Sequence, residues 1–305
     1  MTTSLVGSPR LTTTFLVGAA ASWGLGTVLS KYALGGFPPS VLLPVQLLCS
    51  ALLLGAFLVV GHQSVRSVSQ PGRMALLGIL NPGISYALGL IGLTYIEAST
   101  SVVIWATEPV IIVVMAFAIL REPLSSWAVG CLASAMVGIA LIVGAPAAGN
   151  ATIGVVITFA SVTACAVYTI LLRRMSLNDG TLPVVWIQQV SALVFAATVA
   201  LVWSMLHTVS VSPTLQETMA AAASGATYYG LGFLLYVSGL RRTSAARAGT
   251  FLTLIPVFGL LFSAALLGER FTAVQAVGSL VVIGSMAALT LTDTRRTSPA
   301  AVPRR

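Results

Sequence analysis

Long apolar stretches alternate with short polar or turn-forming segments along the whole chain. One helix needs about 20 mostly apolar residues to cross a bilayer. Alternating ten-residue strand patterns are absent, so the stretches predict membrane-spanning helices rather than a barrel. Ten such spans are expected, at 11–34, 40–61, 73–94, 98–120 and 126–145 in the first half and at 151–172, 182–206, 218–240, 245–267 and 273–292 in the second.

Two spans carry the same sequence pattern. The segment 92–123 superposes without a gap on 239–270 at an offset of 147 positions, which matches Pro109 to Pro256 and Glu122 to Glu269. Proline and acidic residues are scarce in a chain with 14 Pro and 7 Asp+Glu, so these coincidences indicate an internal duplication. A weaker match at an offset of 142 relates the first span to the sixth and the second to the seventh; it pairs Lys31 with Arg173 and Gln46 with Gln188.

The duplication predicts two units, 11–145 and 151–292, followed by a basic tail at 293–305 that we expect to be disordered and cytoplasmic. Each unit has an odd number of spans, so the second copy enters the membrane inverted relative to the first. The expected fold is therefore all-α, with ten transmembrane helices in two inverted five-helix repeats. Such repeats typically build transporters whose site lies near the bilayer midplane.

The distribution of basic residues predicts the orientation. If the N-terminus is cytoplasmic, that side receives all the Lys and Arg residues except Lys31 and Arg270. This asymmetry predicts that both termini are cytoplasmic. The expected location is a bacterial-type plasma (inner) membrane.

Composition agrees with this interpretation. With 57% hydrophobic and 7% charged residues the chain has too much apolar surface for a soluble core, and its mean hydropathy is +1.00. The net charge of +8 lies in short loops and the tail, so we expect no nucleic-acid partner. The three cysteines fall inside apolar spans without metal or disulfide spacing and are interpreted as packing residues.

Glu108 is the strongest candidate for function. It lies midway along the fourth span, with no basic residue in the middle of any span to neutralise it. A bare carboxylate there is costly, so the group is either protonated or faces a water-filled cavity. Both states suit proton coupling or binding of a substrate amine. The alternative is a protonated side chain hydrogen-bonded to a neighbouring helix.

The paired prolines, Pro109 and Pro256, are interpreted either as hinges that move during transport or as static kinks. Aromatic and polar residues in the surrounding spans form the candidate lining of a substrate cavity, although Trp and Tyr near span ends also serve as interfacial anchors. The candidates are Trp23, Asn81, Tyr86, Trp105, Tyr168, Tyr228, Tyr229 and Thr253. A stripe of small residues, Gly130, Ser134 and Gly138, marks either a dimer face or packing within one subunit, which leaves monomer and homodimer open.

No catalytic, metal-binding or nucleotide-binding motif is present, so neither an enzyme nor a cofactor is expected. Two segments resemble the signature of EamA-domain proteins in the drug/metabolite transporter superfamily. They are Gly239-Leu240 to Ala246 with Pro256-Val257-Phe258 and Leu267-Gly268-Glu269-Arg270, and, in the first half, Ala98-Ser99, Glu108-Pro109-Val110 and Arg121-Glu122. The likeness extends from Leu11 to Leu291.

The resemblance implies ten helices in two inverted repeats, cytoplasmic termini and export of small metabolites or drugs, amino acids among them. It also implies a central cavity lined by the first, third, fourth, sixth, eighth and ninth helices. One departure is Gln46, where many members carry an arginine.

The expected function is a secondary transporter that exports small amphipathic metabolites such as amino acids by alternating access, with protons as the candidate coupling ion. A multidrug efflux carrier for lipophilic cations is the alternative within transport. A membrane scaffold or receptor without transport is the alternative from another class.

Overall fold

The computed structural model describes residues 9–108, 111, 126–143, 150–173, 179–240, 251, 254–270 and 272–296. In the first half the helices are α1 (Pro9–Ala33), α2 (Pro39–Val60), η1 (Val65–Ser67), α3 (Pro71–Gly78), η2 (Ile79–Ile84), α4 (Ser85–Tyr95), α5 (Ala98–Trp105) and α7 (Ser126–Val143). In the second half they are α8 (Asn150–Arg173), α9 (Thr181–Leu206), α10 (Leu215–Ser224), η3 (Gly225–Leu231), α11 (Gly232–Leu240), α13 (Leu254–Phe262), η4 (Ser263–Leu267) and α14 (Ala273–Arg296).

Each expected span contains at least one helical segment among the described residues. Several starts follow the sequence punctuation: Pro39 and Pro71 stand in the first turns of α2 and α3, where the missing proline N–H costs nothing. Within the described residues, five helices are long and apolar enough to cross a membrane: 10–33, 39–60, 71–95, 151–172 and 181–206. The prediction of an all-helical membrane protein with ten helices is confirmed.

The third and eighth spans are not continuous α-helices as expected. Each contains a π-helical segment, η2 in the third and η3 in the eighth, and the two segments occupy corresponding positions of the repeat. Asn81 within η2 has extended backbone angles (φ −146°, ψ 117°), so the chain kinks there. A proline follows at Pro82, and proline inside a helix removes one backbone hydrogen bond.

The sequence predicts a disordered tail from residue 293 onward, but α14 continues to Arg296. Residues 293–296 are therefore helical rather than disordered. The remainder of the tail lies outside the described residues, as do most of the fourth span after Glu108 and the first part of the ninth.

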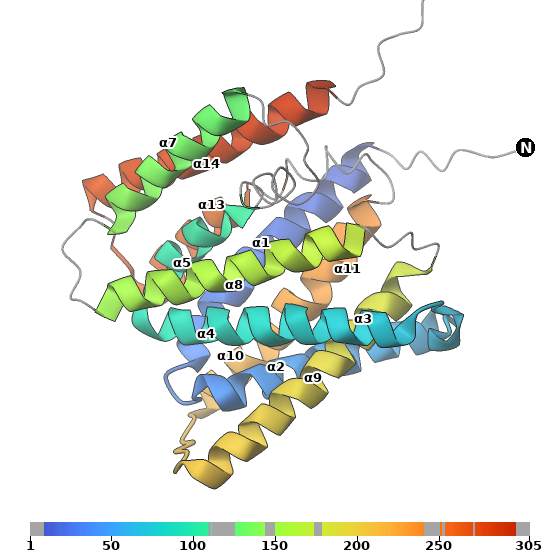
Figure 1. The fold of residues 1–305 in the computed structure, drawn as a ribbon. Coiled ribbons are helices and arrows are strands. Elements are labelled where there is room, and N and C mark those ends of the chain that lie inside the picture. The colour runs from blue at the N-terminus through green and yellow to red at the C-terminus, as the bar shows by residue number, and fades with distance from the viewer. Residues whose placement is uncertain are drawn as a thin grey trace, which may run out of the picture.

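The two halves interleave instead of packing as separate bodies (Figure 1). α1 contacts α11 and α13, and the corresponding helix of the second half, α8, contacts α4 and α5. α2 pairs with α9, and α7 lies beside α14. If the first half is exchanged for the second, the contact of α1 with α11 becomes that of α8 with α4, and the α2–α9 and α7–α14 pairs are unchanged. A two-fold relation between the copies requires this correspondence.

Close helix approaches follow the same exchange. A side chain added at Gly78 would lie 2.5 Å from the Gln188 Cα atom, and one added at Gly225 would lie 2.6 Å from the Gln46 carbonyl oxygen. The offsets of 147 and 142 convert the first pair into the second. Two further contacts are related in the same way. The contact of Gly83 with Phe195 corresponds to that of Gly230 with Leu53, and the contact of Gly92 with Thr158 corresponds to that of Gly239 with Leu16. The structure thus carries the duplication in its packing.

The small-residue stripe of α7 packs in part within the subunit. A side chain at Gly138 would lie 2.8 Å from the Gly278 carbonyl oxygen of α14, whereas the space at Gly130 is open. Close approach of two helices at Gly138 is therefore satisfied without a second copy of the chain.

Candidate functional site

Glu108 lies just beyond α5, where it faces α8 of the other half. Its Oε1 atom accepts a hydrogen bond from the Cys165 thiol at 3.3 Å, and the Thr169 hydroxyl also bonds to the carboxyl group. Cys165 is buried, with 7% of its surface exposed, whereas Glu108 keeps part of its surface accessible. The carboxyl group is thus held between the two halves by neutral donors.

Four of the sequence-predicted residues meet in one aromatic cluster: Tyr86 of α4, Trp105 of α5, and Tyr228 and Tyr229 of η3. The Tyr86 ring lies at the centre, with centroid distances of 5.6 Å to Trp105, 5.3 Å to Tyr228 and 5.1 Å to Tyr229. All three contacts are edge-to-face, the geometry that aromatic pairs favour. Trp105 is the last residue of α5 and precedes Glu108 by three residues, so a single turn of the chain joins the aromatic cluster to the carboxyl group.

Tyr168 extends the polar surface along α8. It stands one turn after Cys165, and its hydroxyl donates to the Gln188 Oε1 atom of α9 at 2.9 Å. The Gln188 Nε2 atom and the Asn81 Oδ1 atom are buried and have no hydrogen-bond partner among the described residues. A buried amide without a partner is costly, so each of these two atoms is a candidate partner for a bound polar group.

Trp23 belongs to a second aromatic group. Its ring packs on Phe233 at 5.6 Å and on Tyr236 at 5.5 Å, both on α11. The groups are connected through α1: the Thr27 hydroxyl donates to the Trp23 carbonyl oxygen at 3.1 Å and also bonds to Tyr228. The structure therefore places Trp23 beside the aromatic cluster rather than within it.

The remaining candidates are less well placed. Pro256 is buried in α13, while Pro109 and Thr253 lie outside the described residues. The sequence does not identify two partners of Glu108, Cys165 and Thr169; the sequence pattern favours a packing role for Cys165. Their four-residue spacing places both on one face of α8, but it does not reveal which face of α8 turns toward α5.

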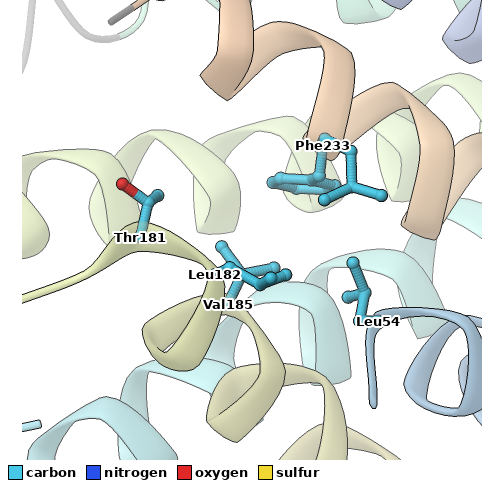
Figure 2. A pocket seen from close by; sticks show the side chains of 6 residues that line it. Leu54, Thr181, Leu182, Val185 and Phe233 are labelled. Atoms are coloured by element: carbon cyan, nitrogen blue, oxygen red, sulfur yellow. The ribbon is translucent and has the colours of Figure 1, made fainter. Parts of the chain in front are cut away.

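An apolar groove lies apart from this site, between α2, α9 and α11. It has an empty volume of about 220 Å³. Figure 2 shows Phe233 opposite Leu54, Leu182 and Val185, with Thr181 at one end. The groove shares no residue with the candidate site and offers no charged group.

Comparison with known proteins shows what this architecture is similar to. Residues 11–144 and 152–291 each match the EamA-like transporter family. An uncharacterized transporter of Clostridium kluyveri is 23% identical over 263 residues, covering 80% of this chain and 82% of that protein. The uncharacterized transporter YvbV of Bacillus subtilis strain 168 is 25% identical over 269 residues, covering 87% of this chain and 86% of that protein.

A solved crystal structure has the same fold, with a TM-score of 0.68 and 21% sequence identity over 94% of this chain and 99% of the other. The two family matches divide the chain close to where the sequence repeat divides it, and together they cover most of its length. The protein is therefore a membrane transporter, not an enzyme, and it belongs to the EamA-like transporter family.

Proposed function

We propose that the protein is a secondary transporter that exports small amphipathic metabolites, amino acids among them, by alternating access. The observation that carries the proposal is the position of Glu108. Its carboxyl group comes from the first half, is held by Cys165 and Thr169 of the second half, and lies one turn from the Tyr86 aromatic cluster. A group bound there touches both halves, so its binding responds to their relative movement.

The chemistry of the site favours a substrate with an amine and an apolar body. The carboxylate binds a cationic amine or exchanges a proton, and the aromatic edges and faces of Tyr86, Trp105, Tyr228 and Tyr229 accommodate apolar surface. The Asn81 and Tyr168 side chains add hydrogen-bonding groups at the edge of the site. Trp23 and Thr253 are proposed as further lining residues, and Pro109 and Pro256 as the hinges of the paired helices.

The distribution of basic residues supports an orientation with both termini in the cytoplasm of a bacterial inner membrane. In that orientation the turns after α1 and α4 face the outside. The intramolecular packing of Gly138 supports a monomer, although a homodimer through another face is compatible with it.

Export of lipophilic cations is the second candidate, because a carboxylate beside four aromatic rings also suits a cation held by its charge and by ring faces. The two substrates are distinguished by what Glu108 does. A cationic drug needs the charge for binding, whereas a zwitterionic amino acid coupled to protons needs it for proton exchange as well.

The test is uptake into proteoliposomes of labelled amino acids and cationic dyes, with and without an imposed proton gradient. We expect gradient-dependent flux in the wild type and a loss of about 100-fold or more in Glu108→Gln, which keeps the size of the side chain but removes its titratable charge. Glu217→Gln, which changes a partly buried capping carboxylate at the start of α10, serves as the control and retains the flux. Equal flux in the wild type and Glu108→Gln contradicts the assignment of Glu108.

A further inference from the structure

The turn between α4 and α5 is bound by a lysine from another helix. The Lys31 Nζ atom, in the last turn of α1, donates to the carbonyl oxygens of Leu93 and Ile96, each at 2.7 Å. These carbonyl groups belong to the C-terminal end of α4, where the last backbone oxygens lack helical partners. An ammonium group is favoured at this end because it also interacts with the helix dipole.

A glutamate binds the other side of the same turn. The Glu269 Oε1 atom accepts from the Ala98 N–H at 2.8 Å, and its Oε2 atom accepts from the Ser99 N–H at 3.0 Å. These are unpaired donors of the first turn of α5, where a carboxylate is favoured. Bonds to ionised groups are stronger than those between neutral partners. The turn at residues 93–99 is thus held at its carbonyl end by a cation and at its N–H end by an anion.

The position of Glu269 depends on the residue before it. Gly268 ends η4 with φ +67°, a left-handed conformation that glycine adopts without steric cost, and the Glu269 N–H then bonds to the Ser263 carbonyl oxygen at 3.3 Å. The chain therefore reverses immediately after the helix and directs Glu269 to α5. The Leu267-Gly268-Glu269 sequence thus has a conformational role, because the turn at Gly268 brings the Glu269 carboxylate to the first turn of α5.

The four hydrogen bonds join two helix pairs at one end of the bundle. Lys31 and Glu269 are attached to α1 and to the α13–η4 segment, which pack together, and the bound turn joins α4 to α5. These same helices carry Thr27, Tyr86 and Trp105, and Glu108 follows α5 directly. A separation of the two pairs at this end would therefore move the elements that carry the candidate site.

The surroundings of the two charges permit such a separation. Lys31 and Glu269 are only partly buried, and their partners here are backbone groups that water can also satisfy. A third charged group, Glu97, lies in the turn itself; its partial burial and the nearby Glu269 carboxylate raise its pKa. The turn also packs on apolar side chains, because Leu93 and Ala98 belong to the same buried cluster as Val28 of α1, so its release separates these contacts together with the four hydrogen bonds.

We propose that Lys31 and Glu269 form a latch that closes the outer end of the transport pathway and releases the α4–α5 turn when the pathway opens to that side. The latch rests on the proposed alternating-access function. It gives Glu269, which the repeat identifies but which lies far from Glu108 in sequence, a role in access rather than in substrate binding.

Cys165 offers a native probe of access, because its thiol is buried beside Glu108. In a Cys49→Ser, Cys131→Ser background, a membrane-impermeant methanethiosulfonate reagent is added to the outer face of intact cells and the rate of Cys165 labelling is measured. Lys31→Met and Glu269→Gln are each expected to raise the rate about tenfold or more, as the loss of charged hydrogen bonds shifts the population toward the outward-open form. Glu217 lies at the same end, but its carboxylate accepts hydrogen bonds from Thr214 and not from the α4–α5 turn, so Glu217→Gln leaves the rate unchanged.

Unchanged labelling in both variants overturns the latch and makes the two charges static helix caps. Glu269→Gln preserves side-chain size and part of the hydrogen bonding, so it supplies the result if Lys31→Met does not reach the membrane. Labelling needs no substrate flux. Absence of any flux in the proteoliposome assay therefore counts against the transport proposal, whereas normal flux with unchanged labelling counts against the latch alone.

Discussion

Gln46 and Gln188 occupy the same position of the repeated unit but have different surroundings. The Gln46 Nε2 atom donates to the hydroxyls of Ser30 at 2.8 Å and Ser224 at 2.6 Å, and its Oε1 atom accepts from Tyr229 at 3.4 Å. Gln188 accepts from Tyr168, but its Nε2 atom has no partner among the described residues. The repeat explains the difference, because Leu172 and Leu77 occupy the positions that correspond to Ser30 and Ser224 when the halves are exchanged.

The packing around these glutamines did not diverge in the same way. Both backbones are approached closely by a glycine, Gly225 at Gln46 and Gly78 at Gln188. Helix contacts in a membrane depend on such close approach, so the backbone geometry of the repeat is constrained. Polar partners, in contrast, can be lost one at a time at a cost of about 1–3 kcal/mol for the atom left unpaired. The two halves therefore share their backbone packing but differ in the hydrogen-bond partners of their buried polar side chains.

The largest expected effect tests the close glycine packing that both halves share. Gly225→Ala and Gly78→Ala should each lower the free energy of unfolding by roughly 3 kcal/mol, because the added methyl group meets backbone atoms that cannot move aside. Thermal unfolding in detergent measures this, with Gly72→Ala as the control, since nothing lies within 4 Å of a side chain there. A full loss in one half and none in the other would show that the packing is not equivalent.

An intermediate effect tests the hydrogen bonding, which differs between Gln46 and Gln188. Gln46→Leu should lower the free energy of unfolding by about 2 kcal/mol, since it removes three hydrogen bonds from a buried site. Gln188→Leu should cost less than about 1 kcal/mol, because the loss of the Tyr168 bond is offset by removal of an unpaired amide. Equal losses, measured by the same unfolding assay, would mean that the Gln188 amide has a partner of its own.

The smallest effect is expected at the serines around Gln46. Ser224→Ala should cost about 1 kcal/mol, as the Gln46 amide loses its shorter hydrogen bond but keeps Ser30. Ser50→Ala is the matched control: its hydroxyl is on the same helix as Gln46, fully buried and without a partner in the described part of the chain. Its removal should be neutral or slightly stabilising. A loss at Ser50 as large as that at Ser224 would remove the basis for this ranking.

Much of the fold followed from the sequence because the bilayer imposes it. Helix length, turn residues and the coincidence of Pro109 with Pro256 were sufficient to predict ten spans and the duplication. The kink at Asn81 was missed, although Asn81-Pro82-Gly83 is a turn-forming sequence inside an apolar run. An apolar run conceals such a break, since its hydropathy is unchanged.

The site was harder to predict because helix rotation leaves little trace in hydropathy. Lipid-facing positions are as apolar as packed ones: Leu52 is 67% exposed on α2, whereas Gln46 on the same helix is fully buried. Residue type alone suggested Tyr86, Trp105, Tyr228 and Tyr229, which the structure brings together. It could not pair Glu108 with Cys165 and Thr169, because that contact depends on which faces of α5 and α8 meet.

The interleaving of the halves has a consequence for biosynthesis. α1 and α4 emerge from the ribosome first, yet the helices that cover them, α11 and α8, belong to the second half. The first five spans therefore enter the bilayer with unfinished faces, and Gln46 has no access to Ser224 until the eighth span is synthesised. A chain stopped after residue 145 lacks the helices that cover α1 and α4, so we expect stable assembly of this transporter to wait for the second half.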